Sequence, residues 1–347
     1  MSRSRQFISI LALPCALLAG PVQAGMARHA LSNGTVEAVV TEAIGGRLLS
    51  FSLKGKPNFL KVDEAAGDPD APVTAQSPNV GYLGHEIWVG PQKQWWTHQS
   101  VNPELAAAQA PWPPDPYLSL ARYTIARRSD DEIVLGSGAS PVNGLQLSKR
   151  YALVKGKPNS LQLDVTATNR RETDVAWDIW FNTRTPAHTQ VYVPVASSGD
   201  VRLQSAAGQP GVEGLSYTLS ERVFSLDMPS APGAAARVGK VFLQPAAGWM
   251  AGFHSGQAFI VQFPLQPRAA IHPDQGQIEL YNDIHPDAPQ AGLLEMEVHA
   301  PYLTLRPGQR MQARETWTLL PYDGPATRAA HLAFLRRHAR ALKLQGL

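Results

Sequence analysis

Short runs of alternating apolar and polar residues extend along most of the chain, and turn residues separate them at intervals of about ten residues. Because successive side chains of a strand point to opposite faces, this alternation predicts strands that bury one face. The runs lie at residues 36–40, 45–53, 117–127, 132–137, 145–154, 161–168, 175–184, 190–195, 241–244, 250–254, 259–263, 277–281, 293–298 and 311–320. The 28 glycines and 29 prolines provide the turns, so the sequence predicts an all-β sandwich or barrel.

The end of the chain differs, because its apolar residues follow the 3.6-residue period of a helix. The residues that share one helical face are Leu332, Leu335, Ala339 and Leu342. We therefore expect a short C-terminal helix at about residues 326–342, with its arginines facing solvent. No linker-like segment divides the strands before it, so residues 25–347 are expected to form a single domain.

The first 24 residues have the features of a secretory signal peptide. Two arginines precede an apolar run at residues 7–20, and Val22-Gln23-Ala24 fits the small-residue pattern of a cleavage site. Cys15 is the only cysteine, so cleavage would leave a chain that folds without disulfides in an oxidising compartment. We expect cleavage after Ala24 and a periplasmic or secreted protein.

The charge of the chain is nearly balanced, with a formal net charge of +3. Binding to nucleic acid or to an anionic membrane needs a basic face or run, so we expect neither partner. No apolar stretch after the leader is long enough to span a membrane, so no membrane insertion is expected after the leader is removed. The sequence contains no zinc-protease motif, phosphate-binding loop or serine-hydrolase elbow, and we expect no cofactor.

Two histidines precede Pro-Asp dipeptides, at His272-Pro273-Asp274 and His285-Pro286-Asp287. Each pair offers an imidazole nitrogen and a carboxylate that a metal ion could bind. Pro-Asp is also a common turn dipeptide, and this interpretation is favoured. The sequence therefore predicts no metal site.

Residues 81–96 are rich in aromatic and amide side chains. Trp88, Gln92 and Trp95 are candidates to bind a sugar, because an indole ring stacks on the apolar face of a sugar while amides bond its hydroxyl groups. The flanking glycines and proline favour a loop at a sheet edge. The alternative is a core strand with aromatic anchors, which is common for tryptophan.

Residues 177–184 alternate in a way that separates two faces of one strand. One face carries Asp178, Trp180, Asn182 and Arg184, and the other carries Trp177, Ile179 and Phe181. The first face combines an indole platform with an acid, an amide and a guanidinium, which suits a ligand. A structural Asp–Arg pair on an ordinary sheet is the alternative.

Residues 293–301 show a similar alternation, with Glu295, Glu297 and His299 opposite an apolar face. Two carboxylates two residues apart on a strand lie about 6.5–7 Å apart. If burial separates their pKa values, such a pair can divide acid and base work. A solvent-facing strand edge gives the same pattern, and spacing alone favours this second interpretation.

Several segments occur in an order that points to a known family. They are Gly-Gly-Arg-Leu-Leu-Ser-Phe-Ser-Leu at 45–53, Gly-His-x-x-Trp-x-x-Pro-Gln at 84–92, Thr168-Asn169, Leu-Glu-Met-Glu at 294–297, Leu-Arg-Pro-Gly at 305–308 and Glu-Thr-Trp at 315–317. This order resembles the galactose mutarotase-like, or aldose 1-epimerase-like, superfamily, and more narrowly a bacterial group of it without an assigned function. The resemblance covers about residues 28–320. It implies a large antiparallel β-supersandwich with a sugar-binding concave face.

The resemblance also implies catalytic roles. Glu295 matches the superfamily glutamate that takes the anomeric proton, Glu297 is the near alternative, and His85 resembles a second histidine of the superfamily. The mid-chain histidine that protonates the ring oxygen has no counterpart in residues 180–184. We therefore expect an exported protein that binds a sugar or glycan. The alternatives are an epimerase that uses Glu295 as base and His85 as acid, and an envelope scaffold without a ligand.

Overall fold

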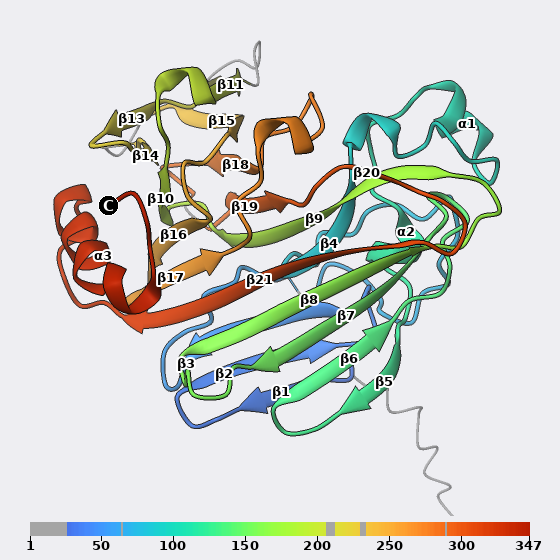
Figure 1. Ribbon diagram of the computed structural model, residues 1–347, viewed down its shortest axis with the longest axis horizontal. Helices are drawn as coiled ribbons and strands as arrows, with labels where there is room; N and C mark the ends of the chain where they lie inside the picture. Colours follow the sequence, from blue (N-terminus) through green and yellow to red (C-terminus); the bar gives the residue numbers. More distant parts are fainter. Residues whose placement is uncertain (1–25, 64, 206–211, 230–233, 289) are drawn as a thin grey trace, which may run out of the picture.

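Most of the chain folds into two antiparallel β-sheets, as the alternation predicts (Figure 1). The computed structural model describes residues 26–63, 65–205, 212–229, 234–288 and 290–347. The expected leader, with its cleavage site after Ala24, lies outside the described residues. The two sheets lie face to face (Figure 1).

The first sheet has eleven strands, all paired antiparallel except β12, which pairs parallel with β15. Its main path runs β1-β2-β3-β4-β9-β19-β18-β15-β11, and β20 pairs with β9. The bounds are β1 His29–Ser32, β2 Val36–Thr41, β3 Arg47–Leu53, β4 His85–Gly90, β9 Val175–Pro186, β11 Val201–Ser205, β12 Val212–Glu213, β15 Ala236–Leu243, β18 Ile278–Ile284, β19 Leu293–His299 and β20 Leu303–Leu305.

The second sheet has ten strands in the order β13-β14-β10-β16-β17-β21-β8-β7-β6-β5. The bounds are β5 Thr124–Arg128, β6 Glu132–Gly136, β7 Leu145–Leu153, β8 Ser160–Asn169, β10 Gln190–Pro194, β13 Tyr217–Ser220, β14 Val223–Leu226, β16 Trp249–His254, β17 Gln257–Gln262 and β21 Arg310–Pro321. Every pairing in this sheet is antiparallel.

The main hydrophobic core lies between the two sheets. The ring of Phe51 on β3 lies 5.8 Å from that of Trp317 on β21, and the backbone N–H of Leu53 donates to Gln257 on β17 at 2.8 Å. Fully burying one large apolar side chain stabilises the fold by about 1.5–3 kcal/mol, so the many side chains in this layer fix how the sheets face each other. The first sheet therefore has an inner face, toward the second sheet, and an outer face, away from it.

The C-terminal helix α3, Arg328–Leu342, agrees with the expected helix. The Thr327 side chain caps its first turn by accepting from the backbone N–H of Ala330. Leu332 and Leu335 pack against a second apolar cluster on β10, β16 and β17, so α3 covers that end of the second sheet (Figure 1). In the part of the chain that the structure describes, no helix is long and apolar enough to cross a membrane.

Two short helices replace expected irregular or strand structure. They are α1, Pro103–Ala107, and α2, Pro116–Ser119, and each has proline at its start and a capping side chain before it, from Asn102 and Asp115. The strand expected at residues 117–127 is therefore wrong over its first part, because Pro116 and the Asp115 cap begin a helix there. The described residues also contain three single turns of 3₁₀ helix: η1 Gln92–Gln94, η2 Ser198–Asp200 and η3 Arg268–Ala270.

Candidate functional site

The outer face of the first sheet collects polar side chains from five neighbouring strands, β4, β9, β19, β18 and β15. Strand register places Glu86 beside Asn182, Asn182 beside Glu297, and Glu297 beside Glu279. A second row contains Trp88, Trp180 and His299, and a third contains Arg184, Glu295 and Tyr281. Polar residues that are far apart in the sequence thus form adjacent rows on one surface.

Arg184 links two of these rows. Its Nε donates to Glu295 Oε1 at 2.8 Å, and one terminal nitrogen donates to Glu86 Oε1 at 2.5 Å. Arg47 donates to the other oxygen of Glu86 at 2.7 Å. Burial alone would raise the pKa of Glu86, but the charges of Arg47 and Arg184 hold it below its usual value. Glu295 is the most open member of this group, because 15% of its side chain is exposed.

Tryptophan rings cover the side of Arg184. The Trp88 ring lies 4.6 Å from the guanidinium carbon of Arg184, 4.9 Å from the Trp180 ring and 5.4 Å from the Trp95 ring. Trp112 adds a fourth ring, 6.0 Å from Trp88, and it is 47% exposed although the other three are buried. Trp112 therefore extends a buried aromatic cluster to the surface.

Gln92 and Trp95 support this cluster through backbone contacts. Gln92 donates its side-chain amide to the carbonyl of Pro111, next to Trp112, at 2.9 Å. The indole N–H of Trp95 donates to the Val89 carbonyl at the end of β4. The Gln92 bond holds the segment around Trp112 to η1, and the Trp95 bond holds the end of η1 against β4. β4 lies inside the sheet and not at the sheet edge that the sequence favoured.

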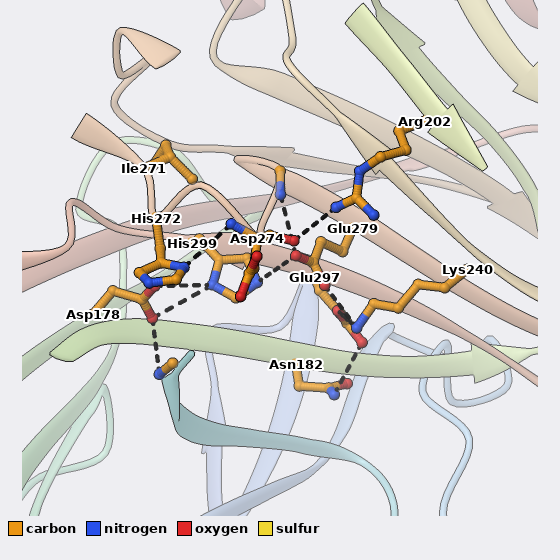
Figure 2. A network of polar contacts seen from close by, with 12 residues as sticks. Asp178, Asn182, Arg202, Lys240, Ile271, His272, Asp274, Glu279, Glu297 and His299 are labelled. Carbon is orange, nitrogen blue, oxygen red and sulfur yellow. Dashed lines mark hydrogen bonds and ion pairs between the residues drawn. The ribbon is translucent and has the colours of Figure 1, made fainter. Parts of the chain in front are cut away.

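A buried ion network fills the other half of the outer face (Figure 2). His299 Nδ1 lies 3.3 Å from Asp178 Oδ2, and His299 Nε2 lies 3.4 Å from Glu279 Oε1. The ammonium of Lys240 lies 2.7 Å from Glu279 and 2.9 Å from Glu297. Lys240 also stands 4.7 Å from the ring of Trp180, which connects the network to the aromatic cluster.

Burial and pairing shift the acidities in this network in opposite directions. Burial lowers the pKa of His299, but the charges of Asp178 and Glu279 outweigh it and raise that pKa to about 9. Burial raises the pKa of Glu297, whereas Lys240 and His299 overcome the effect of burial on Glu279 and hold its pKa low. Asp178 and Glu279 therefore favour the protonated form of His299, which lies fully buried between them.

The structure brings together most of the residues that the sequence singled out. Trp88, Asp178, Trp180, Asn182, Arg184, Glu295 and Glu297 lie on the outer face, and Gln92 and Trp95 lie beside it. Whether these side chains bind a sugar stays a prediction.

His85 does not lie with them. It points to the inner face, where Nδ1 is 2.9 Å from the Thr183 hydroxyl and the ring lies 4.8 Å from Trp317. It is fully buried, and burial, with the nearby cations Lys149, Arg184 and Arg47, lowers its pKa well below the usual value. The expectation that His85 acts as an acid beside Glu295 is wrong, because the sheet itself separates the two side chains.

Sequence reasoning missed several members of the face: Arg47, Glu86, Trp112, Lys240 and Glu279. The alternation of Glu279, Tyr281 and Asp283 with apolar residues on β18 was a usable signal for Glu279. His272 and His285 have other partners than the ion network: the Asp274 backbone N–H donates to His272 at 3.2 Å, and His285 pairs with Asp283 at 2.7 Å.

The sequence matches, over residues 26–320, the model of a protein family described as a domain of unknown function, DUF4380. The chain belongs to the DUF4380 family. No curated protein matches the sequence of this DUF4380 protein.

Several solved structures have a fold similar to that of this DUF4380 protein. A galactose mutarotase-like protein from Lactobacillus casei matches with 13% identity and a TM-score of 0.51, covering 85% of this chain and 100% of its own. A candidate aldose 1-epimerase from Escherichia coli K12 matches with 14% identity and a TM-score of 0.50, covering 86% and 100%. The Slr1438 protein from Synechocystis matches with 10% identity and a TM-score of 0.54, covering 85% and 96%.

At identities this low the likeness concerns the fold alone. It confirms the resemblance drawn from the sequence and the expected fold class. This DUF4380 protein has the galactose mutarotase-like fold, a large antiparallel β-supersandwich with a C-terminal helix.

Proposed function

We propose that this protein is an exported carbohydrate-binding protein, and that a sugar or glycan binds on the outer face of the first sheet, between Trp112 and Glu295. The observation that carries the proposal is the exposed indole of Trp112, which packs on the Trp88 and Trp95 rings. An exposed tryptophan that buried rings hold in place is a rigid stacking platform, and it loses little conformational entropy when a ligand binds.

Polar groups that suit sugar hydroxyls lie close to this platform. Arg184 contacts Trp88 on one side and Glu295 on the other, so a continuous chain of contacts runs from the indoles to a partly exposed carboxylate. Tyr281 lies across from Glu295 in the strand register and adds a phenolic hydroxyl. A few directed polar groups beside an apolar platform are typical of small-molecule sites. The names of the structures with this fold, a galactose mutarotase-like protein and an aldose 1-epimerase candidate, also favour a sugar.

The geometry favours binding over epimerisation. Epimerisation of an anomeric centre needs a base and an acid on the same side of the sheet as the substrate. Glu295 can supply the base, but His85 faces the core, and His299 is fully buried between Asp178 and Glu279. The outer face thus offers a candidate base without an accessible imidazole acid among the described residues.

Thermal denaturation of the mature protein with a panel of monosaccharides and envelope glycans tests the proposal. A ligand that binds should raise stability by about 2.7 kcal/mol at a hundredfold excess over its Kd. Trp112→Ala should weaken that ligand roughly 10- to 100-fold by loss of stacking and burial. Leu265→Ala is the control, because Leu265 is equally exposed, at 47%, and belongs to a different surface. If no sugar stabilises the protein, or if Trp112→Ala binds as tightly as wild type, the proposed site is wrong.

Glu295→Gln separates binding from catalysis. In a binding protein it should change sugar affinity by a few fold, and wild type should not accelerate the interconversion of sugar anomers. If NMR of a fresh anomer shows acceleration by wild type that Glu295→Gln abolishes, the epimerase alternative replaces the proposal.

Export is part of the proposal and has its own test. The positive start, the apolar run and the Val22-Gln23-Ala24 pattern favour cleavage after Ala24. N-terminal sequencing of the protein from a fractionated bacterial host should give Gly25 as the first residue. A chain that retains Met1 in the cytoplasmic fraction would contradict it.

A further inference from the structure

The buried ion network contains three side chains arranged like the ligands of a metal ion. Glu279, Glu297 and His299 each offer one ligand atom, and these atoms all lie within 4.8 Å of one another. His299 Nε2 and Glu279 Oε1 are 3.4 Å apart. Two ligands on a tetrahedral zinc ion, with bonds of about 2.0–2.1 Å, are separated by about 3.4 Å. One imidazole and two carboxylates are also a donor set that zinc and manganese accept.

Outer contacts hold these side chains in ligand orientation. Asp178 lies 3.3 Å from His299 Nδ1, and the Gly90 backbone N–H fixes Asp178 at 3.0 Å. A carboxylate on Nδ1 directs Nε2 toward the metal in many metalloproteins. Here Nε2 is completely buried, has no hydrogen-bond partner of good geometry, and points at the two glutamates (Figure 2). Glu279 is held in turn by the Gly276 backbone N–H at 3.1 Å.

A side chain of the protein already supplies a cation at this position. The Lys240 ammonium bridges Glu279 and Glu297, at 2.7 and 2.9 Å. It reaches them from β15, and 17% of the Lys240 side chain is exposed. A metal ion bound to the same carboxylates would lie next to this ammonium, and the two positive charges would repel each other strongly in a buried site.

We propose that Glu279, Glu297 and His299 form a divalent transition-metal site and that the ammonium of Lys240 occupies its cation position, so that the native protein is closed to metal. In this arrangement the Lys240 ammonium takes the structural role that a bound metal ion would have. It neutralises the carboxylates and holds Glu297 next to Asn182, whose amide lies 3.4 Å from Glu297 Oε1.

Removal of the ammonium should open the site. In Lys240→Met the side chain keeps most of its length, stays unbranched and apolar, and loses its charge. Titration calorimetry of tag-free protein with ZnCl₂ should show one ion per chain, bound roughly 100-fold or more tightly than by wild type, because a unit charge within about 4 Å of the ion is gone. Lys93→Met is the matched control, since Lys93 is 74% exposed and lies outside the network, and it should bind zinc as weakly as wild type.

Further variants identify the ligands. Adding His299→Ala or Glu297→Gln to Lys240→Met should abolish the gained site. Zinc should raise the melting temperature of Lys240→Met and leave that of wild type unchanged, which provides a readout even if the substitution lowers stability. Lys240→His, which offers a fourth ligand, should bind zinc at least as tightly as Lys240→Met.

Two results would overturn the proposal. If neither Lys240→Met nor Lys240→His binds zinc, the three side chains are not a metal site. If wild type binds zinc tightly through His299, the lysine does not close the site. Neither result depends on a sugar, so the proposed carbohydrate function stands or falls separately.

Discussion

Glu315 gives the clearest quantitative test of how this fold holds buried charge. It lies on β21 and points into the core between the sheets, in line with Met311, Trp317 and Leu319. It is 1% exposed, and the indole N–H of Trp317 donates to its Oε2 at 2.8 Å. Burial raises the pKa of Glu315 to about 8, although the bond from Trp317 lowers it.

The raised pKa sets the sign of the effect on stability. The unfolded chain releases the proton near pH 4.5, whereas the folded protein retains it up to about pH 8. Between these values the native state binds more protons, so the free energy of unfolding falls as pH rises. At about 1.36 kcal/mol per pH unit, this group alone costs about 3 kcal/mol between about pH 4.5 and pH 7.

Glu315→Gln removes the ionisation and keeps an oxygen for the Trp317 indole. The variant should match wild type near pH 4.5 and exceed it by about 3 kcal/mol near pH 7, or by about 5 °C in melting temperature. Urea denaturation at both pH values measures the difference. Glu172→Gln is the control, because Glu172 is exposed on a loop, and it should show no such gain. If the advantage of Glu315→Gln is the same at both pH values, Glu315 does not titrate as argued.

Three further predictions concern other parts of the molecule. Arg184→Met leaves Glu86 and Glu295 without their shared guanidinium and should lower the free energy of unfolding by about 3–5 kcal/mol, measured in urea. Burial lowers the pKa of His331 to about 4, so the unfolded chain binds the extra proton and stability should fall as pH drops from about 6.5 to 4. His331→Phe should weaken that dependence in thermal scans. Gly90→Ala would place a methyl group 2.7 Å from Asp178 Oδ1 and should destabilise by about 1–3 kcal/mol, whereas Gly136→Ala, with open space around it, should not.

The sequence predicts the outer-face residues of single strands well, because a strand alternates faces with a period of two. Asp178, Trp180, Asn182 and Arg184 share a face in the sequence pattern and in the structure. This inference needs only the local residues. The inference holds even though both faces of β9 are buried, because the opposite face carries the apolar side chains of Trp177, Ile179 and Phe181.

The same rule could have excluded His85. His85 and Trp88 are three residues apart on β4, and an odd separation places two side chains on opposite faces of a regular strand. The aromatic composition of residues 81–96 suggested Trp88 as a site residue and the superfamily resemblance suggested His85, but the strand can present only one of the two side chains outward. Glu86, one residue along, is the side chain that joins Trp88 on the outer face.

The positions of Lys240 and Trp112 could not be predicted from their neighbours in the sequence, because contacts with distant parts of the chain determine them. Lys240 meets Glu279 only through the register between β15 and β18, which the surrounding chain sets and not the residues near Lys240. Trp112 lies in a Pro- and Ala-rich segment with no periodicity. Its position is set by the bond from Gln92 to the neighbouring Pro111 and by ring contacts with Trp88 and Trp95. Local patterns predict which way a side chain points; the pairing of distant strands determines its neighbours.

The buried ion pairs of the outer face are better explained as a means of orienting side chains than as a source of folding free energy. Replacing a buried ion pair with apolar side chains is often neutral or stabilising, so Arg47, Glu86 and Arg184 add little as a source of folding energy. Their contacts instead fix the guanidinium of Arg184, whose Nε holds Oε1 of Glu295. Among the described contacts of Glu295, this one leaves Oε2 open to hydroxyl donors. The buried Arg184–Glu86 pair thereby fixes the position of one partly exposed carboxylate, Glu295, which is the preorganisation that the proposed sugar site requires.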